Sequence, residues 1–488
     1  MNKFYLEKMQ KNSDIQYKAG YIYTLCTIAS LGNLFYGVML TIFTPVQDYF
    51  LTFLYPGLGS AELGFIIACV PIGGAIGSSI AGETTSRVGR HRLIVILDII
   101  TIIVSSCSLV VNKGILIASR LILGLCVGFN SVVSPLYQIE VVPNPLRGLP
   151  GTYSQLFMTG GIFTTFVIGL FIPGKAGPQS DLWRFLFLLP AIICSIRLSL
   201  FLTIFRFETP KYLVLKHREE EAEKVLAHLY HEEAIKEKLE ELQIDRKIES
   251  SKGKKMTVLD LFKPRFRKRA LLGCFLGLLQ QLSGIGCVGY YANQIFKQGL
   301  EDPDHSHVPQ HFSFYMTLIN LIVVALSVGL VKKIGRKFLT VTGLITIISC
   351  HLGFFILGVA THDTSPVSKY LILIFEGAYG FSLGPAVGAY LLETLPDVGY
   401  SLAVLCKWIG SILGAQFFPI LVDAVGLDYA FLLFAILCCI GLIIISIFMI
   451  ETRGRSSQEV DELFYPKQTD NKKITDSLLA GHMSNDML

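Results

Sequence analysis

The sequence predicts an all-α membrane protein in which twelve transmembrane helices form two pseudo-symmetric six-helix bundles. Of its 488 residues, 52% are hydrophobic and only 16% are charged, and the apolar residues come in blocks. A run of roughly 20 apolar residues crosses the core of a bilayer. About twelve such runs occur, near residues 21–44, 61–81, 93–111, 114–137, 150–172, 184–206, 270–296, 312–331, 338–359, 368–392, 399–422 and 428–449.

Basic residues indicate the orientation of these spans, because Lys and Arg gather in alternate loops. They include Arg87, Arg90 and Arg92 after the second run and Lys332, Lys333, Arg336 and Lys337 after the eighth. Loops rich in Lys and Arg remain in the cytoplasm. With an even number of spans, both termini are expected there too, and we expect no cleavable signal peptide before the first span. We expect a multi-pass protein of the plasma membrane.

The runs divide the chain into five parts. These are a cytoplasmic N-terminal arm (1–20), an N-terminal six-helix bundle (21–206), a cytoplasmic helical linker (207–269), a C-terminal six-helix bundle (270–450) and a cytoplasmic tail (451–488). The linker carries the charged stretches EEEAEK and KEKLEEL with leucines at helical spacing, which predicts two to four short amphipathic helices. Its charges form either a solvated face or contacts that hold the two halves together.

Three charged motifs occur in both halves in the same order. The first half has RVGR (87–90), E-x-x-P (140–143) and Glu208-Thr209, and the second has KIGR (333–336), E-x-x-P (393–396) and Glu451-Thr452. Parallel six-helix repeats place a substrate site at their interface near the membrane midplane. Since each motif lies at the cytoplasmic end of its helix, we expect the Arg and Glu side chains to pair when that side is closed and to separate when it opens.

The stretch QQLSGIGCVGYY (280–291) places two adjacent glutamines at membrane depth. Unpaired amides are costly in hydrocarbon, so these amides must face other helices or a wet cavity. Gln280, Gly284, Cys287 and Tyr291 recur at i, i+4, i+7 and i+11, which predicts one stripe of a continuous helix. Two interpretations stay open, in which the amides either bind a polar ligand or join helices.

With these motifs the chain resembles the major facilitator superfamily and, within it, the sugar porter family of facilitative hexose transporters. The resemblance extends over nearly all of residues 20–465. It also rests on PLYQIEVVPNPLRG (135–148), Gln155-Leu156, Trp183-Arg184, FETPKYL (207–213) and ETRGRS (451–456). It implies the major facilitator fold.

The resemblance further implies amide and aromatic side chains around a sugar, and charged side chains at a gate. The implied substrate-binding residues are Gln155, Gln280, Gln281, Asn320 and Trp408, with Tyr290 and Tyr291 in the extracellular gate. The implied cytoplasmic gate comprises Arg87, Arg90, Glu140, Arg147, Glu208, Lys333, Arg336, Glu393 and Glu451. Amides suit this task because they both donate and accept hydrogen bonds, as sugar hydroxyls do.

The chain departs from the family pattern at several positions. Gly286 replaces the usual Asn in span seven, and Gly388 stands where glucose transporters carry a Trp. Both changes widen the pocket, so fructose or a broader hexose preference is an alternative to glucose. The gate also has fewer charges than usual, with Ser86, Lys332 and Tyr400 at three of its positions.

Span one contains no Asp or Glu, whereas proton-coupled sugar porters place a carboxylate there, and this difference favours passive transport. Ionisable residues at membrane depth are candidates for function. Glu376 in span ten and Lys407 in span eleven are expected to form a structural ion pair, with proton coupling or binding of an anionic substrate as alternatives. Asp98 and Arg197 are expected to form an ordinary structural pair.

These observations predict facilitative uniport of a hexose such as glucose or fructose by alternating access. The alternatives are a proton-coupled sugar symporter and a non-transporting sugar sensor. The sequence contains no P-loop and no metal-ligand cluster of the enzyme type, and His305, His307 and His311 between spans seven and eight are expected to lie in a solvated loop, with weak metal binding as the alternative. We therefore expect neither enzyme activity nor a cofactor. The expected partners are the sugar and the lipid bilayer, without nucleic acid, and the chain is expected to act as a monomer.

Overall fold

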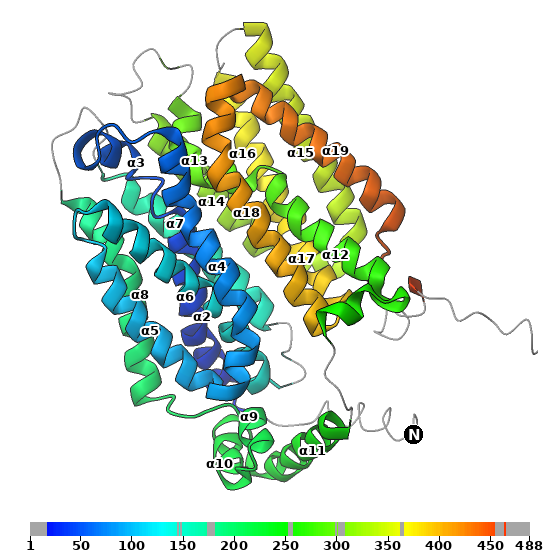
Figure 1. Ribbon diagram of the computed structural model, residues 1–488. Coiled ribbons are helices and arrows are strands. Elements are labelled where there is room, and N and C mark those ends of the chain that lie inside the picture. Colours follow the sequence, from blue (N-terminus) through cyan, green and yellow to red (C-terminus); the bar gives the residue numbers. More distant parts are fainter. Residues whose placement is uncertain are drawn as a thin grey trace, which may run out of the picture.

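The computed structural model describes residues 17–143, 146, 149–172, 181–251, 257–297, 300, 308–361, 366–453 and 463–464. Within these ranges the regular elements are helices, which form two groups side by side in Figure 1. The first half consists of α2 (Ala19–Thr41), α4 (Ser60–Val88), α5 (Arg90–Cys107), α6 (Lys113–Val141), α7 (Leu149–Gly169) and α8 (Leu182–Thr203). The second half consists of α12 (Pro264–Leu282) with α13 (Ile285–Lys297), α14 (Val308–Ile334), α15 (Arg336–Thr361), α16 (Pro366–Phe381) with α17 (Leu383–Thr394), α18 (Asp397–Val425) and α19 (Leu427–Phe448).

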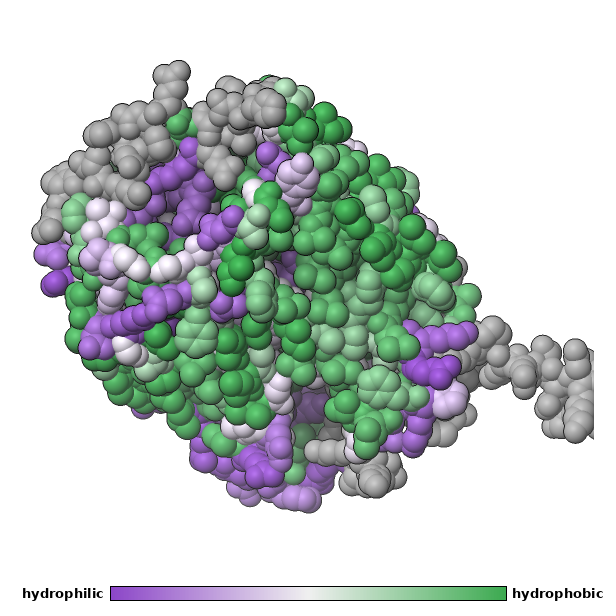
Figure 2. Space-filling model, turned by 45° about the horizontal axis from the view of Figure 1, so that its top comes forward, coloured by the Kyte–Doolittle hydropathy of each residue, from purple (hydrophilic) through white to green (hydrophobic). Residues whose placement is uncertain are grey.

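Ten helices in the described ranges are long and apolar enough to cross a membrane, with α12–α13 and α16–α17 each counted as one span. Two more helices, α5 and α7, pack among them. The 18 residues of α5 include Arg90, Arg92 and Asp98, which explains its lower apolarity. Figure 2 shows a broad apolar surface over the helices, with hydrophilic residues gathered toward the ends of the bundle. The all-α membrane fold predicted from the sequence is confirmed.

Short helices of the linker lie under the first half, at the bottom of Figure 1. They are α9 (Pro210–Leu215), α10 (Glu219–Leu229) and α11 (Glu232–Ser251). The 3₁₀ helix η4 (Val258–Phe262) packs instead on α12 and α18 of the second half, so the expected two to four helices are present. The backbone N–H of Lys18 donates to the carbonyl of Leu229 at 2.9 Å, which ties the start of α2 to α10. We call this end of the bundle the linker side and the other end the opposite side.

The predicted continuous helix across Gln280–Tyr291 is wrong, because the span is broken into α12 and α13. Gly284 has a φ of +93°, a conformation that glycine adopts without the steric cost paid by other residues. The span of α16 and α17 is also broken, at Ser382. Breaks of this kind expose backbone polar groups, which are tolerated at membrane depth only inside the protein or next to a cavity.

The two halves pack together through α4 with α18 and α7 with α14. Gly64 in α4 lies so close to α18 that an added Cβ atom would stand 2.6 Å from the carbonyl oxygen of Gln416. Gln416 Nε2 also donates to the carbonyl of Ala61 at 3.1 Å, and the rings of Phe163 and Phe314 are 5.6 Å apart. These residues lie in the parts of their helices toward the opposite side, where the halves are held close.

Candidate functional site

The two helix breaks are joined to each other by a buried glutamine. Gln280 is 4% exposed, and its Nε2 donates to the carbonyls of Leu383 at 2.8 Å and Gly384 at 3.3 Å, at the start of α17. His351 Nε2 donates to the carbonyl of Ser283, 2.9 Å away. The amide nitrogen of Gln280 therefore stabilises the broken backbone, which matches the helix-joining interpretation of this residue.

Gln281 lies between three elements rather than on one helix face. An added Cβ atom at Gly286 of α13 would stand 2.7 Å from Gln281 Oε1, and one at Gly410 of α18 would stand 2.9 Å from Gln281 Cβ. Its side chain is half-buried, and no hydrogen bond to another described residue occupies its amide. Gln281 can therefore offer both a donor and an acceptor to a polar ligand.

Aromatic side chains on α18 and α13 occupy the interface between the halves. Trp408 of α18 is 4% exposed, and its ring lies 5.6 Å from that of Tyr36 in α2 and against Gly74 of α4. One turn further, Ser411 hydrogen-bonds the hydroxyl of Tyr290 at 2.7 Å. The hydroxyl of Tyr291 donates to the carbonyl of Ala415 at 2.6 Å.

The expected ion pair between Glu376 and Lys407 is wrong. Glu376 Oε1 instead accepts a hydrogen bond from Asn320 Nδ2 at 3.1 Å, and Glu376 Oε2 is buried without a hydrogen-bond partner among the described residues. Lys407 forms no ion pair within the described part of the chain. The position of each residue along its helix was compatible with pairing, but helix rotation turns Glu376 toward α14.

Gln155 of α7 is half-buried, and its backbone carbonyl accepts a hydrogen bond from Thr159.

The charged motifs of the first half form a compact cluster on the linker side. Arg90 and Glu140 form a buried ion pair at 2.8 Å, and Thr209 Oγ1 donates to the other oxygen of Glu140 at 2.5 Å. Glu208 Oε1 accepts the backbone N–H groups of Arg90 and His91, each at 2.9 Å, at the start of α5. A carboxylate there interacts favourably with the helix dipole. The cluster therefore holds α5, α6 and the linker together.

The second half repeats this arrangement with its own residues. Arg336 and Glu393 form an ion pair at 2.5 Å, and Thr452 Oγ1 donates to Glu393 at 2.6 Å. Glu451 accepts the backbone N–H groups of Arg336 at 2.9 Å and Lys337 at 3.0 Å, at the start of α15. The set of three motifs that the sequence repeats in its two halves therefore forms a repeated three-dimensional cluster, and each cluster stays within its own half.

Three predicted gate residues fall outside these clusters. Arg87 is exposed and pairs with Glu83 on the same helix, while its backbone carbonyl accepts from the hydroxyl of Tyr212 at 3.0 Å. Arg147 lies outside the described residues. Lys333 lies in α14, and its side chain is outside the described set.

A set of contacts on the opposite side was missed by the sequence reasoning. Thr44 Oγ1 donates to the carbonyls of Gly289 and Tyr290, both at 3.0 Å. Asp48, in the short helix α3 (Gln47–Tyr49), pairs with Lys297 at 2.8 Å. The only signal in the sequence was an isolated acid after span one and an isolated base after span seven, which is too weak to predict a pair.

The described geometry is two six-helix halves with broken helices and amide-bearing side chains at their interface. The sugar (and other) transporter family matches residues 10–464 of the chain. The chain belongs to the sugar porter family. The glucose transporter GlcP of Staphylococcus epidermidis is 29% identical to this chain, which we call the porter below, over 90% of this chain and 96% of the relative. The arabinose-proton symporter of Bacillus subtilis is 28% identical over 91% and 95% of the two chains.

A human protein and a solved bacterial structure are also similar to this chain. Solute carrier family 2, facilitated glucose transporter member 5 of Homo sapiens is 27% identical to the porter over 88% of this chain and 86% of the relative. Among solved structures, the inward open conformation of the xylose transporter XylE from E. coli matches with a TM-score of 0.74 and 21% identity, over 91% of this chain and 99% of that chain. This likeness supports the fold. The porter is thus a multi-pass membrane transporter of sugars rather than an enzyme.

Proposed function

We propose that the porter carries a hexose such as glucose or fructose down its gradient by alternating access, without coupling to protons. The observation that carries this proposal is the composition of α2, whose 23 residues include no Asp or Glu. Its buried polar residues are uncharged, as at Ser30, Asn33 and Thr41. A neutral helix at the interface has no group that gains or loses a proton at physiological pH.

The sugar site in this proposal lies between the halves, next to the broken spans. Gln281 and Asn320 offer amides to the hydroxyls, Trp408 and Tyr290 offer apolar surface, and Gln155 of α7 is the proposed contribution of the first half. An added Cβ atom at Gly388 would meet no atom within 4 Å, which supports a pocket wider than one closed by a Trp at that position. We propose that the linker side, where the basic loops lie, is cytoplasmic and that the membrane is the plasma membrane.

The two halves are proposed to rock about this site. Contacts such as Thr44 with Tyr290 and Ala61 with Gln416 hold the opposite side together, while the charged clusters on the linker side each join helices of one half only. This arrangement corresponds to a transporter closed on the opposite side. Opening that side requires these contacts to break. Because each Arg–Glu pair joins helices of a single half, the pairs need not separate when the linker side opens, unlike the expectation from the sequence.

The test is counterflow of labelled glucose and fructose in liposomes that contain the purified porter, with and without a proton gradient. Exchange that falls at least tenfold in Gln281→Ala supports sugar transport at this site, and the absence of sugar accumulation when a proton gradient is imposed supports uniport. Accumulation of sugar driven by the proton gradient contradicts uniport. No exchange of either sugar by the folded protein contradicts the hexose assignment.

A second candidate, proton-coupled symport, is favoured by one observation. Glu376 is 7% exposed and carries an oxygen without a described partner, and its other oxygen contacts Asn320 of the proposed sugar site. A carboxylate in such a place could link sugar binding to proton binding. Under symport, Glu376→Gln abolishes accumulation driven by a pH gradient but preserves counterflow. Under uniport, the gradient has no effect on either protein.

A further inference from the structure

A buried histidine of α15 contacts the broken span that carries Gln281. His351 is 1% exposed, and its Nε2 donates to the carbonyl of Ser283, 2.9 Å away. Ser283 follows the last residue of α12 and is itself fully buried. Helix α15 supplies none of the proposed sugar-binding residues, so the proposed sugar site does not by itself account for this contact.

The carbonyl of Ser283 lacks its ordinary helical partner. In a continuous helix it would accept a hydrogen bond from the backbone N–H of Cys287, four residues further along. After the break, the N–H of Val288 donates to the carbonyl of Gly284 at 2.9 Å, and no backbone N–H in the described part of the chain donates to that of Ser283. His351 therefore supplies the donor that the break removes, at a depth where an unpaired carbonyl is costly.

Three aromatic rings hold the imidazole of His351. Its centroid lies 4.8 Å from that of Phe375 in α16, and 5.3 Å and 6.0 Å from those of Phe431 and Phe434 in α19. Phe434 also packs against the break, since a Cβ atom added at Gly284 would stand 2.9 Å from its Cδ2. The same apolar pocket therefore fixes both the donor and the backbone that it contacts.

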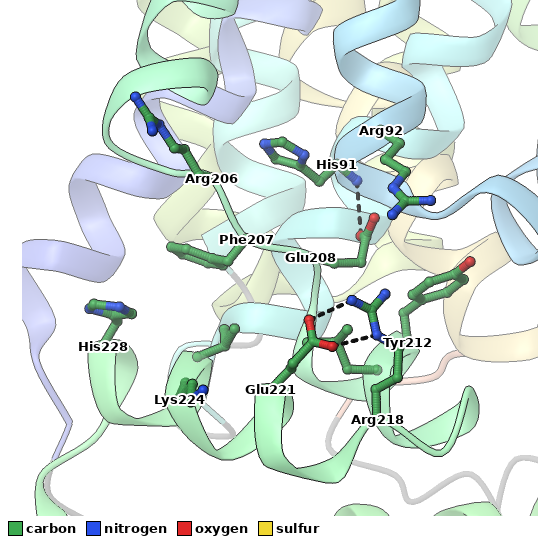
Figure 3. A pocket seen from close by; sticks show the side chains of 12 residues that line it. His91, Arg92, Arg206, Phe207, Glu208, Tyr212, Arg218, Glu221, Lys224 and His228 are labelled. Carbon is green, nitrogen blue, oxygen red and sulfur yellow. Dashed lines mark hydrogen bonds and ion pairs between the residues drawn. The ribbon is translucent and has the colours of Figure 1, made fainter.

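This pocket is closed to solvent, unlike the surroundings of the histidines on the linker side. Figure 3 shows His91 and His228 in the walls of a cavity of about 280 Å³, where the start of α5 meets α10. His91 is half-buried and His228 is exposed, so water can reach both rings. A hydrogen bond in a dry apolar pocket is electrostatically stronger, and its loss leaves a carbonyl that water cannot satisfy.

Helix α15 contacts the second broken span as well. A Cβ atom added at Gly343 would stand 1.8 Å from Ser382 Oγ, at the break between α16 and α17. Gln280 links the two breaks, because its Nε2 donates to carbonyls at the start of α17. Gly343 and His351 are separated by about 12 Å along their helix. One helix therefore braces both breaks, and His351 is its polar contact with the first.

We propose that His351 is a positioning residue for sugar binding, which acts through the carbonyl of Ser283 on the place of the Gln281 amide. The break and Gln281 are directly coupled, because the backbone N–H of Gly284 donates to the carbonyl of Gln281 at 3.1 Å. Gln281 Oε1 lies beside Gly286 on the far side of the break, so a shift of α13 against α12 moves the amide relative to its neighbours. The inference rests on the proposed function, since it takes Gln281 as a sugar-binding residue.

The test is the concentration dependence of counterflow, measured with labelled glucose and fructose in liposomes that contain the full-length porter. His351→Phe keeps an aromatic ring but removes the donor, whereas His351→Gln keeps an N–H donor at a similar reach. The apparent KM should rise roughly fivefold or more in His351→Phe, which corresponds to one lost hydrogen bond, and should return to about the wild-type value in His351→Gln. The matched control is Thr346→Val, which removes an exposed hydroxyl bonded to the carbonyl of Thr342 in the same helix.

A purely structural role for His351 would lower the amount of folded porter, and hence the maximal rate, without changing the apparent KM. An unchanged KM in folded His351→Phe, or an equally raised KM in His351→Gln, overturns the inference. If His351→Phe does not fold, His351→Leu, which has a smaller side chain than Phe, takes its place.

The same measurements separate this inference from the proposed function. Wild-type protein that exchanges neither sugar overturns the proposed function, and the inference with it. Exchange that is lost in Gln281→Ala but has an unchanged KM in His351→Phe overturns the inference alone.

Discussion

Asp48 and Lys297 form an ion pair, with 2.8 Å between Oδ2 and Nζ, that joins the two halves on the opposite side. Asp48 lies in α3 of the first half, and Lys297 is the last residue of α13 in the broken span of the second. Their side chains are only 10% and 16% exposed, so water screens the pair less than at an open surface. Under alternating access, this pair breaks whenever the opposite side opens.

Lys297→Gln is expected to raise the population of molecules open on the opposite side. If the pair contributes about 1.4 kcal/mol to closure, the ratio of open to closed molecules rises about tenfold. Spin-label distances between Ser60 and Ile420, after replacement of the exposed native cysteines, measure this ratio. Exchanging the charges, with Asp48→Lys and Lys297→Asp together, should restore the wild-type distribution. An unchanged distribution in Lys297→Gln would mean that the pair does not hold the gate.

Gly64→Leu is expected to separate α4 from α18 on the opposite side. The new side chain would meet the backbone of Gln416, since even a Cβ atom there stands 2.6 Å from its carbonyl oxygen. Backbone cannot move aside as a flexible side chain does, so transport should fall at least tenfold in counterflow. The matched control is Gly82→Leu on the same helix, where an added Cβ meets nothing within 4 Å. Equal activity of the two variants contradicts the predicted close approach.

Asp98→Asn is expected to destabilise the first half. Asp98 and Arg197 are each fully buried, and Arg197 Nε donates to both carboxylate oxygens at 3.1 and 3.0 Å. Removing one charge leaves the other buried and unpaired, at a cost of about 3–5 kcal/mol. The apparent melting temperature reports this loss. Glu83→Gln, which removes an exposed pair, should cost less than about 1 kcal/mol.

The contribution of Glu451 to stability is expected to depend on pH. Partial burial acts to raise the pKa of Glu451, but four backbone N–H donors, from Arg336, Lys337, Phe338 and Arg453, outweigh it and hold the pKa below its usual value of 4.5. A carboxylate with a lowered pKa stabilises the fold above its unfolded pKa, and this stabilisation is lost as the pH falls through the folded value.

Melting temperatures of wild type and Glu451→Gln between pH 7 and pH 3 test this expectation. The two should differ by a constant amount down to about pH 4.5 and converge below it. Glu237→Gln, an exposed change on α11, should follow wild type across the range. A difference that is already gone at pH 6 contradicts the predicted direction of the pKa shift.

Gly388→Trp is expected to narrow the sugar site and to change the preference between hexoses. An added Cβ atom at this position has no neighbour within 4 Å, so the indole can enter without displacing backbone. If the open space at Gly388 is what admits fructose, the ratio of fructose to glucose counterflow should fall at least tenfold in this variant. Gly388→Ala, which adds one methyl group, should keep the wild-type ratio. An unchanged ratio in both variants places the selectivity elsewhere.

Several features of the site could be predicted from the sequence. The repeated motifs predicted equivalent charged groups, and the structure shows Arg90 with Glu140 and Arg336 with Glu393 in matching clusters. The prediction worked because the same motifs occur at equivalent helix ends in both halves, so equivalent Arg and Glu side chains meet in each half. In contrast, a stripe through Gln280 and Tyr291 assumed a regular helix, and one glycine at φ +93° breaks it.

The sequence by itself determined the all-α membrane class, the two-part division and the basic loops, because apolar run length and loop charge are local properties of the chain. Only the tertiary structure decided that Glu376 meets Asn320 rather than Lys407 and that Gln280 braces a second broken span. It alone also brought Asp48 to Lys297 across the interface. The physical reason is that such partners depend on how far each helix is rotated and displaced along its axis, and the packing of all the helices sets both at once.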